Sequence, residues 1–214
     1  MTRFMPDLID SDGINQPLPY FNVQRWSSAS VKVTKLSAYN PKWPAHYTDE
    51  ARRILGILGS HAARIEHVGS TAVPGLMAKP VIDIQVSVLS LSPFERCREL
   101  LAQLGYHFVP LGEFDNVYPF FTRPLNWPST HHVHLCEAES AVERDHLVFR
   151  DYLRAHADVA RQYEALKFEL AARHHGLDLA SREMYSLGKT GFVRHVLALA
   201  AAGAAGLPAP SRKR

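Results

Sequence analysis

Residues 81–89, with the sequence VIDIQVSVL, form a nearly continuous run of apolar and β-branched side chains. Such a run predicts a strand that is buried in the middle of a sheet. Asp83 lies inside it, and a carboxylate is costly to bury unless it is paired or binds a cation. Strand side chains alternate, so Gln85 points to the same side. We therefore predict a central strand with a functional Asp83, the alternative being a structural ion pair with a Lys or Arg.

The segments around this strand predict an α+β fold, in which a mixed β-sheet is flanked by helices and followed by a helical part. Ser92 is the expected N-cap of one helix, and Pro44 and Pro93 fit the first turns of two helices. The expected strands cover residues 31–36, 64–68, 106–109, 117–123 and 131–136, and the expected helices cover 44–59, 92–104, 140–155, 157–175 and 181–202. The predicted organisation is an N-terminal extension (1–30), one domain (31–200, with an α/β core at 31–138 and a helical part at 139–200) and a disordered tail (201–214).

Composition narrows the class of partner. A formal net charge of +3 on 214 residues is too small for the electrostatic footprint of a nucleic-acid-binding protein. The N-terminus lacks an apolar signal core, and the longest apolar run is too short to span a bilayer. Two cysteines make no disulfide framework. We therefore expect a cytoplasmic protein with a small-molecule partner and no membrane; the oligomeric state stays open.

A Gly69-Ser70 pair follows the expected strand at 64–68. Glycine lets backbone N–H groups approach a phosphate, and a hydroxyl adds another donor. A Gly-Ser pair on its own is usually just a turn. Glu66 and His67 precede it and could reach the same cleft. A Ser70–His67–Asp83 hydrolase is disfavoured, because the Gly-x-Ser-x-Gly elbow is missing.

The expected strand at 131–136 contains His131-His132-Val133-His134. His132 and His134 share one face of such a strand, and His131 points away. Two imidazoles at this spacing fit either a metal site or a pair of phosphate donors. The alternative is a polar outer face.

The helical half carries basic and aromatic residues at a spacing of four. Tyr163 and Lys167 share a helix face, as do Tyr185 and Lys189. These pairs could close over an anion together with Arg150, or they could form a solvated helix surface.

Five segments of the chain resemble the GrpB family of nucleotidyltransferase-like proteins. They are IEHVGSTAVPGLMAKPVIDI (65–84), HVHL (132–135), LVFRDYLR (147–154), YEALK (163–167) and YSLGK (185–189), and YNPKW (39–43) is similar to the family's opening motif. The resemblance covers about residues 31–200, and the first segment is the most specific.

The resemblance implies the mixed sheet of the nucleotidyltransferase superfamily and a helical C-terminal part. It maps Gly69 and Ser70, with Thr71 beside them, onto the phosphate turn, and Asp83 onto the first metal carboxylate. Gln85 stands where the superfamily has its second metal carboxylate, and so departs from the pattern. His132 or His134 stands where a third carboxylate is expected. GrpB-like domains are also found fused to dephospho-coenzyme A kinase, which suggests a nucleotide or coenzyme A context.

These observations leave three hypotheses. The first is a metal-dependent enzyme that transfers a nucleotidyl group from a nucleoside triphosphate to a small acceptor. In it the metal ion, Mg²⁺, Mn²⁺ or Zn²⁺, is held by Asp83, His132 and His134. The negative charge of the transition state is neutralised by Lys79, Arg150, Lys167 and Lys189. The second is a binding or accessory module that has lost transfer chemistry, which Gln85 favours. The third is a metal-dependent hydrolase that uses His67, Asp83 and the His-x-His pair.

Overall fold

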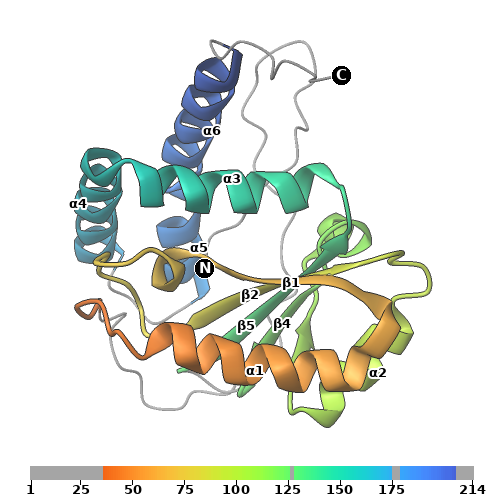
Figure 1. Cartoon of the computed structure of the whole chain (residues 1–214). Helices are drawn as coiled ribbons and strands as arrows, with labels where there is room; N and C mark the ends of the chain where they lie inside the picture. Colours follow the sequence, from red (N-terminus) through yellow and green to blue (C-terminus); the bar gives the residue numbers. More distant parts are fainter. Residues whose placement is uncertain (1–35, 126–127, 175–178, 206–214) are drawn as a thin grey trace, which may run out of the picture.

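The computed structural model describes residues 36–125, 128–174 and 179–205, and it has the predicted α+β architecture (Figure 1). A mixed sheet is flanked by helices, and the helical part follows it in the chain. The elements are α1 (Trp43–Leu58), β1 (Ala62–Val68), β2 (Ile82–Val88), α2 (Glu95–Gln103), β3 (His107–Val109), β4 (Phe120–Arg123), β5 (His131–Glu137), α3 (Ala141–Ala155), α4 (Ala157–Arg173), α5 (Leu179–Leu187) and α6 (Thr190–Ala205), with 3₁₀ turns at Gly59–His61, Ser70–Ala72 and Gly112–Asn116.

The five strands lie in the order β1-β2-β5-β4-β3, so the strand expected at 81–89 is confirmed as an internal strand, β2. It pairs antiparallel with β1 and parallel with β5, while β4 pairs antiparallel with both β3 and β5. In the parallel ladder Asp83 pairs with His132 and Gln85 with His134. The sheet thereby brings together polar side chains that lie about fifty residues apart in the sequence.

The alternation along β2 separates a structural face from a polar face. Ile82, Ile84 and Val86 belong to the main hydrophobic core, which α1 and α2 cover. Asp83 and Gln85 point to the opposite face, on the side of α3; Figure 1 shows α1 and α3 on opposite sides of the sheet. The candidate site therefore lies between the sheet and the helical part.

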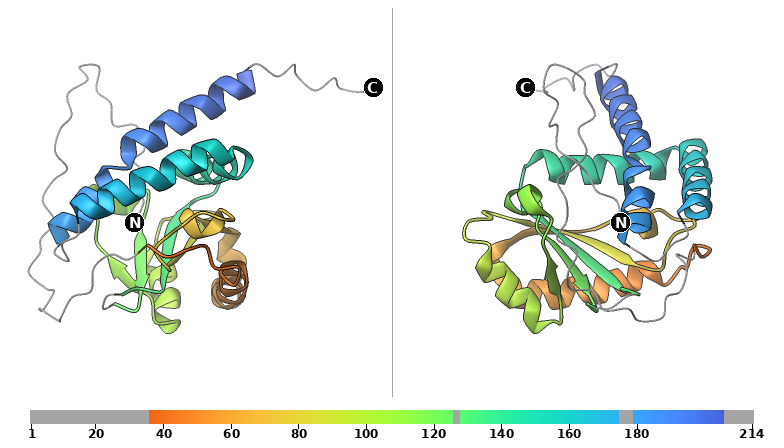
Figure 2. Two further views of the ribbon diagram at one scale, coloured as in Figure 1. Left: turned by 90° about the vertical axis from the view of Figure 1, so that its left-hand side faces the viewer. Right: turned by 180° about the vertical axis from the view of Figure 1, so that it is seen from behind.

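The helical part has its own hydrophobic cluster, in which α3, α4 and α6 pack together (Figure 2). Phe149 and Tyr163 meet edge to face with their ring centroids 5.2 Å apart. Val73 and Leu76, from the loop between β1 and β2, belong to the same cluster. The loop that carries Gly69 and Lys79 is therefore fixed against the C-terminal helices.

Two predicted helices were wrong in detail. The helix expected at 92–104 begins at Glu95, with Phe94 as its N-cap, because Ser92 is held in the preceding loop by hydrogen bonds with Ser90. The helix expected at 181–202 is two helices, α5 and α6, separated at Gly188 and Lys189. Gly188 packs so closely on α4 that an added Cβ would lie 2.4 Å from Leu170 Cδ2.

Several predicted segments at the two ends of the chain lie outside the described residues: the N-terminal extension (1–30), residues 31–35 of the first expected strand and residues 206–214 of the tail. Helix α6 continues to Ala205, past the expected domain end at 200. The strand expected at 117–123 begins only at Phe120. Both cysteines, Cys97 and Cys136, are buried free thiols. Among the described residues, no helix is long and apolar enough to cross a membrane.

Candidate functional site

Asp83, His132 and His134 converge on one face of the sheet. His132 Nδ1 and His134 Nε2 each lie 3.1 Å from Asp83 Oδ1, and the three candidate ligand atoms all lie within 4.8 Å of one another. Around a tetrahedral Zn²⁺ with bonds of about 2.0–2.1 Å, neighbouring ligand atoms are about 3.3 Å apart. The donor set and its spacing therefore fit a divalent metal ion with only small movements.

The electrostatics leave this set ready to bind a cation. Burial raises the pKa of Asp83, but hydrogen bonds from His132 and His134 outweigh it and hold the pKa well below its ordinary value. Burial lowers the pKa of His132 to about 4, although Asp83 opposes the shift. At neutral pH the site thus combines a carboxylate with a neutral His132 imidazole, the protonation states that metal binding requires.

The backbone at Gly69 lies directly beside the Asp83 carboxylate. It has a φ of +71°, and a Cβ built there would lie 2.5 Å from Asp83 Oδ2. The register that pairs Val68 with Asp83 brings the turn to this position. Only glycine lets the chain turn this closely beside the carboxylate. The Gly69-Ser70 turn and Asp83 therefore belong to one site, with Ser70 half-buried at its side.

Sequence reasoning missed two residues behind the ligands, Tyr118 and His146. The Tyr118 hydroxyl is hydrogen-bonded to His134 Nδ1, and His146 Nδ1 lies 2.6 Å from Gln85 Oε1. Burial holds the pKa of His146 well below its ordinary value, so this ring is neutral and its Nδ1–H donates to Gln85. The sequence did contain a signal for His146. It lies four residues before Arg150, a site candidate, and therefore on the same face of α3.

Gln85 is fully buried, and its side-chain amide is engaged on both ends. Its oxygen accepts from His146, and its nitrogen lies 3.4 Å from Ser87 Oγ. It therefore does not supply a second metal carboxylate, and it anchors α3 to the sheet.

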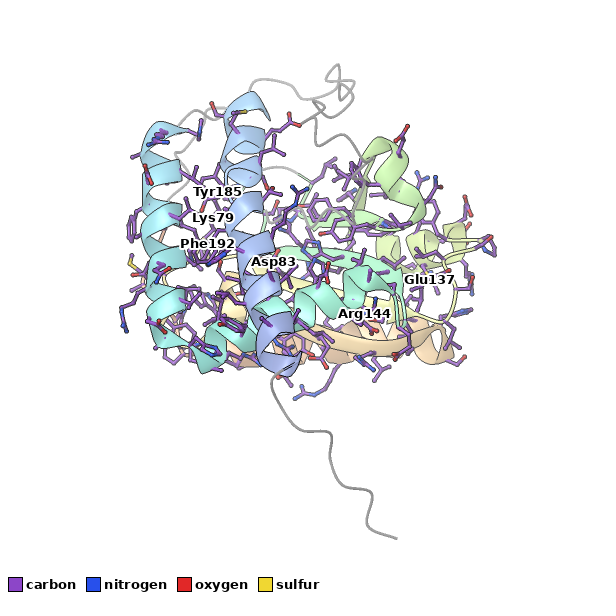
Figure 3. The ribbon with its side chains drawn as sticks, turned by 90° about the horizontal axis from the view of Figure 1, so that it is seen from above. Lys79, Asp83, Glu137, Arg144, Tyr185 and Phe192 are labelled. Carbon is purple, nitrogen blue, oxygen red and sulfur yellow. The ribbon has the colours of Figure 1, made fainter. Side chains whose placement is uncertain are left out.

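A second group of site candidates surrounds two tyrosines near α4, α5 and α6. The ammonium groups of Lys79 and Lys189 lie 3.9 and 4.7 Å from the centre of the Tyr185 ring, and that of Lys167 lies 5.0 Å from the Tyr163 ring. Figure 3 shows Lys79 and Tyr185 close together between α4 and α6, while Glu137 and Arg144 lie away from them, on the other side of Asp83 in this view. We call Lys79, Lys167 and Lys189 the lysine cluster.

The lysine cluster is unusually buried. Lys167 and Lys189 expose only 2% and 3% of their surface. Burial lowers the pKa of Lys167 to about 7 and that of Lys189 to about 8, and the neighbouring Asp83 charge opposes the shift at Lys189. Lys167 donates to the Met77 carbonyl. Lys189 is therefore near enough to the metal-ligand candidates for the charge of Asp83 to act on it.

Other candidates from the sequence are engaged within the protein. Arg150 donates to Glu66, Asp151 and the His67 carbonyl, with Arg150 Nη1 2.7 Å from Glu66 Oε2. The Thr71 hydroxyl donates a hydrogen bond to the Val81 carbonyl and accepts one from His67 Nε2–H. The His67 ring stacks on the Tyr47 ring. Tyr163 packs in the helical core, as described above. These contacts fix the positions of Glu66, His67, Thr71, Arg150 and Tyr163, whose predicted part in ligand binding stays a prediction.

The buried His67 makes the stability of the fold depend on pH. Burial, with Arg154 and Arg150 nearby, lowers its pKa to about 4. The unfolded imidazole takes up a proton below about pH 6.5 and the folded one only near pH 4, so stability is lost as pH falls through this window. We expect His67 to account for about 2 kcal/mol of lost unfolding free energy between pH 7 and pH 5. Urea titrations of wild type and His67→Gln at both pH values check this, and an equal loss in both proteins would contradict it.

Comparison with known proteins finds a matching family model and several similar proteins. The family model described as GrpB protein matches residues 33–199. A UPF0157 protein of Pseudomonas aeruginosa is 39% identical over 188 residues, which cover 86% of this chain and 74% of that protein. The crystal structure of protein GrpB from Enterococcus faecalis matches with a TM-score of 0.67 and 30% identity, covering 79% of this chain and 99% of that one. A dephospho-CoA kinase of Mycobacterium tuberculosis is 44% identical over 79 residues, which cover 34% of this chain and 18% of the kinase.

Proposed function

The chain belongs to the GrpB family, and from this premise we propose that it binds a divalent metal ion together with a phosphorylated small molecule. Asp83, His132 and His134 hold the metal in this proposal, and the Gly69-Ser70 turn faces the phosphate. The observation that carries it is the convergence of one carboxylate and two imidazoles within 4.8 Å on neighbouring strands.

The donor set favours Zn²⁺ or Mn²⁺ over Mg²⁺. Imidazole nitrogen suits zinc and other transition metals, whereas Mg²⁺ prefers oxygen ligands and keeps several waters. Two of the three ligands here are imidazoles. Three protein ligands also leave a coordination position for a ligand oxygen, as in catalytic zinc sites.

The phosphorylated ligand is proposed to be a nucleotide or a coenzyme A-type molecule. The dephospho-CoA kinase relative supports this class, and the lysine cluster supports a ligand with several negative charges. A bound metal would polarise a phosphoryl oxygen at this position. The chain's own part is to orient the phosphate at Gly69 and Ser70 and to neutralise its charge with lysines.

A second candidate is transfer of a nucleotidyl group to a small acceptor. It is less well supported than binding, because the amide of Gln85 stands where a second metal carboxylate would be needed and is held by His146 and Ser87. Release of pyrophosphate from a nucleoside triphosphate, dependent on both metal and acceptor, would establish it.

Calorimetric titration of the metal-free protein with Zn²⁺, Mn²⁺ and Mg²⁺, followed by ATP and coenzyme A, tests the proposal. We expect one metal per chain, Zn²⁺ bound more tightly than Mg²⁺, and ligand binding that strengthens when metal is present. Failure of all three metals to bind would overturn the metal centre.

Tyr118→Phe should weaken Zn²⁺ binding by about tenfold, because groups that orient a metal-binding histidine typically contribute 10–100-fold. When Nε2 of His134 binds metal, Nδ1 carries the hydrogen and donates a hydrogen bond to the Tyr118 oxygen. Phenylalanine lacks this oxygen. Tyr106→Phe is the matched control, since its buried hydroxyl bonds Glu50 in a contact remote from the metal ligands. Equal zinc affinities for the two variants would exclude this role of Tyr118.

A further inference from the structure

The junction between α5 and α6 contains buried polar groups that the metal centre does not use. Ser186 is 3% exposed, and its buried Oγ has no hydrogen-bond partner among the described residues. The Oγ1 atom of Thr190 is also buried without a hydrogen-bond partner there. A buried hydroxyl without a partner costs about 1–3 kcal/mol, so a native protein rarely keeps one unless something else binds it. Two such hydroxyls, four residues apart, mark this junction as incomplete.

The groups beside these hydroxyls favour an anion. Lys189 lies between Ser186 and Thr190 in the chain. The ammonium groups of Lys189 and Lys79 both lie over the Tyr185 ring. The sixteen-residue helix α6 begins at Thr190, so its N-terminal N–H groups and its dipole add positive potential at the same place. The break between α5 and α6 at Gly188 and Lys189 creates this helix start.

We propose that the α5–α6 junction binds the outer phosphates of a polyphosphate chain, with Ser186, Lys189, Thr190 and Lys79 as its contacts. This deepens the proposed function and rests on it: the inner end of the same ligand lies at the metal centre. The charge of Asp83 acts on Lys189, which agrees with one ligand reaching both positions. A phosphate monoester carries only about two negative charges, too few to offset the lysine cluster and a divalent metal together. The ligand class is therefore a di- or triphosphate, either free or within a nucleotide.

The test measures binding of inorganic tripolyphosphate, orthophosphate and ATP to the full chain, first without metal and then with Mn²⁺. We expect tripolyphosphate to bind at least tenfold more tightly than orthophosphate. Lys189→Gln should weaken tripolyphosphate and ATP by at least tenfold, and Ser186→Ala by about fivefold. Mn²⁺ affinity measured alone should stay unchanged in Ser186→Ala.

Ser186→Ala also carries an internal check on folding. Removing an unpartnered hydroxyl should leave the melting temperature equal or raised while ligand binding weakens. The matched control is Ser87→Ala, whose buried hydroxyl lies 3.4 Å from Gln85 Nε2; it should lower the melting temperature and keep tripolyphosphate binding. Wild-type tripolyphosphate affinity in both Ser186→Ala and Lys189→Gln would overturn the junction site even if metal binds. Absence of metal binding, with tripolyphosphate still dependent on Lys189, would instead remove the metal centre and support the junction.

Discussion

Asp83→Asn should lower the affinity for Zn²⁺ by at least about 100-fold. The substitution removes the one carboxylate of the site and leaves two imidazoles, which hold a metal ion only weakly. It also replaces the charged acceptor of hydrogen bonds from His132 and His134, so the metal-free protein should lose about 1–3 kcal/mol of stability. Metal titration and urea denaturation measure the two effects separately.

Asp151→Asn is the matched control for this variant. Asp151 also accepts hydrogen bonds from a basic partner, with Arg150 Nε 2.8 Å from its Oδ1, but its contact lies on α3 and it is not among the candidate ligands. We expect wild-type zinc affinity in this control. A fully folded Asp83→Asn protein with wild-type zinc affinity would exclude Asp83 from the metal centre.

Gly69→Ala is expected to reduce both stability and metal binding. At a φ of +71° and a ψ of −170° an alanine is strained by about 1–3 kcal/mol, and its Cβ would lie 2.5 Å from Asp83 Oδ2. The carboxylate must move or the turn must open, so we expect a total loss of about 2–4 kcal/mol. Zinc affinity should fall by at least about tenfold, because the moved carboxylate no longer lies close to both imidazoles.

Gly75→Ala separates the two causes. Gly75 has a similar φ of +80°, but a Cβ there would meet nothing within 4 Å. This control should lose only the backbone contribution, about 1–2 kcal/mol, and retain zinc binding. Equal stability losses and unchanged zinc binding in both variants would show that the contact between Gly69 and Asp83 has no part in the site.

The sequence predicted the centre of the sheet because the signals there are local and strong. The apolar run around Asp83 and the alternation in His132-Val133-His134 each define a strand and its polar face. In the structure the two strands are parallel neighbours in a register that pairs Asp83 with His132. The pairing itself could not be derived from the pattern alone, since it depends on how the chain between the strands folds.

The parts that were missed depend on tertiary contacts. Tyr118 lies just before β4, in a segment that was expected to be strand, and its role comes from its hydrogen bond to His134 on β5. The break between α5 and α6 at Gly188 and Lys189 interrupts a segment whose helical pattern predicted one continuous helix. The ion pairs of Arg150 with Glu66 and Asp151 could likewise not be predicted, because helical spacing shows which face a residue shares but not its ion-pair partners.

The most direct test of the metal centre is X-ray absorption at the zinc edge on protein loaded with one Zn²⁺ per chain. The account predicts a shell of nitrogen and oxygen ligands at about 2.0–2.1 Å with the scattering of two imidazoles, reduced to one in His132→Ala or His134→Ala. Zinc that is lost on gel filtration, or an imidazole signal that both variants leave unchanged, would contradict it.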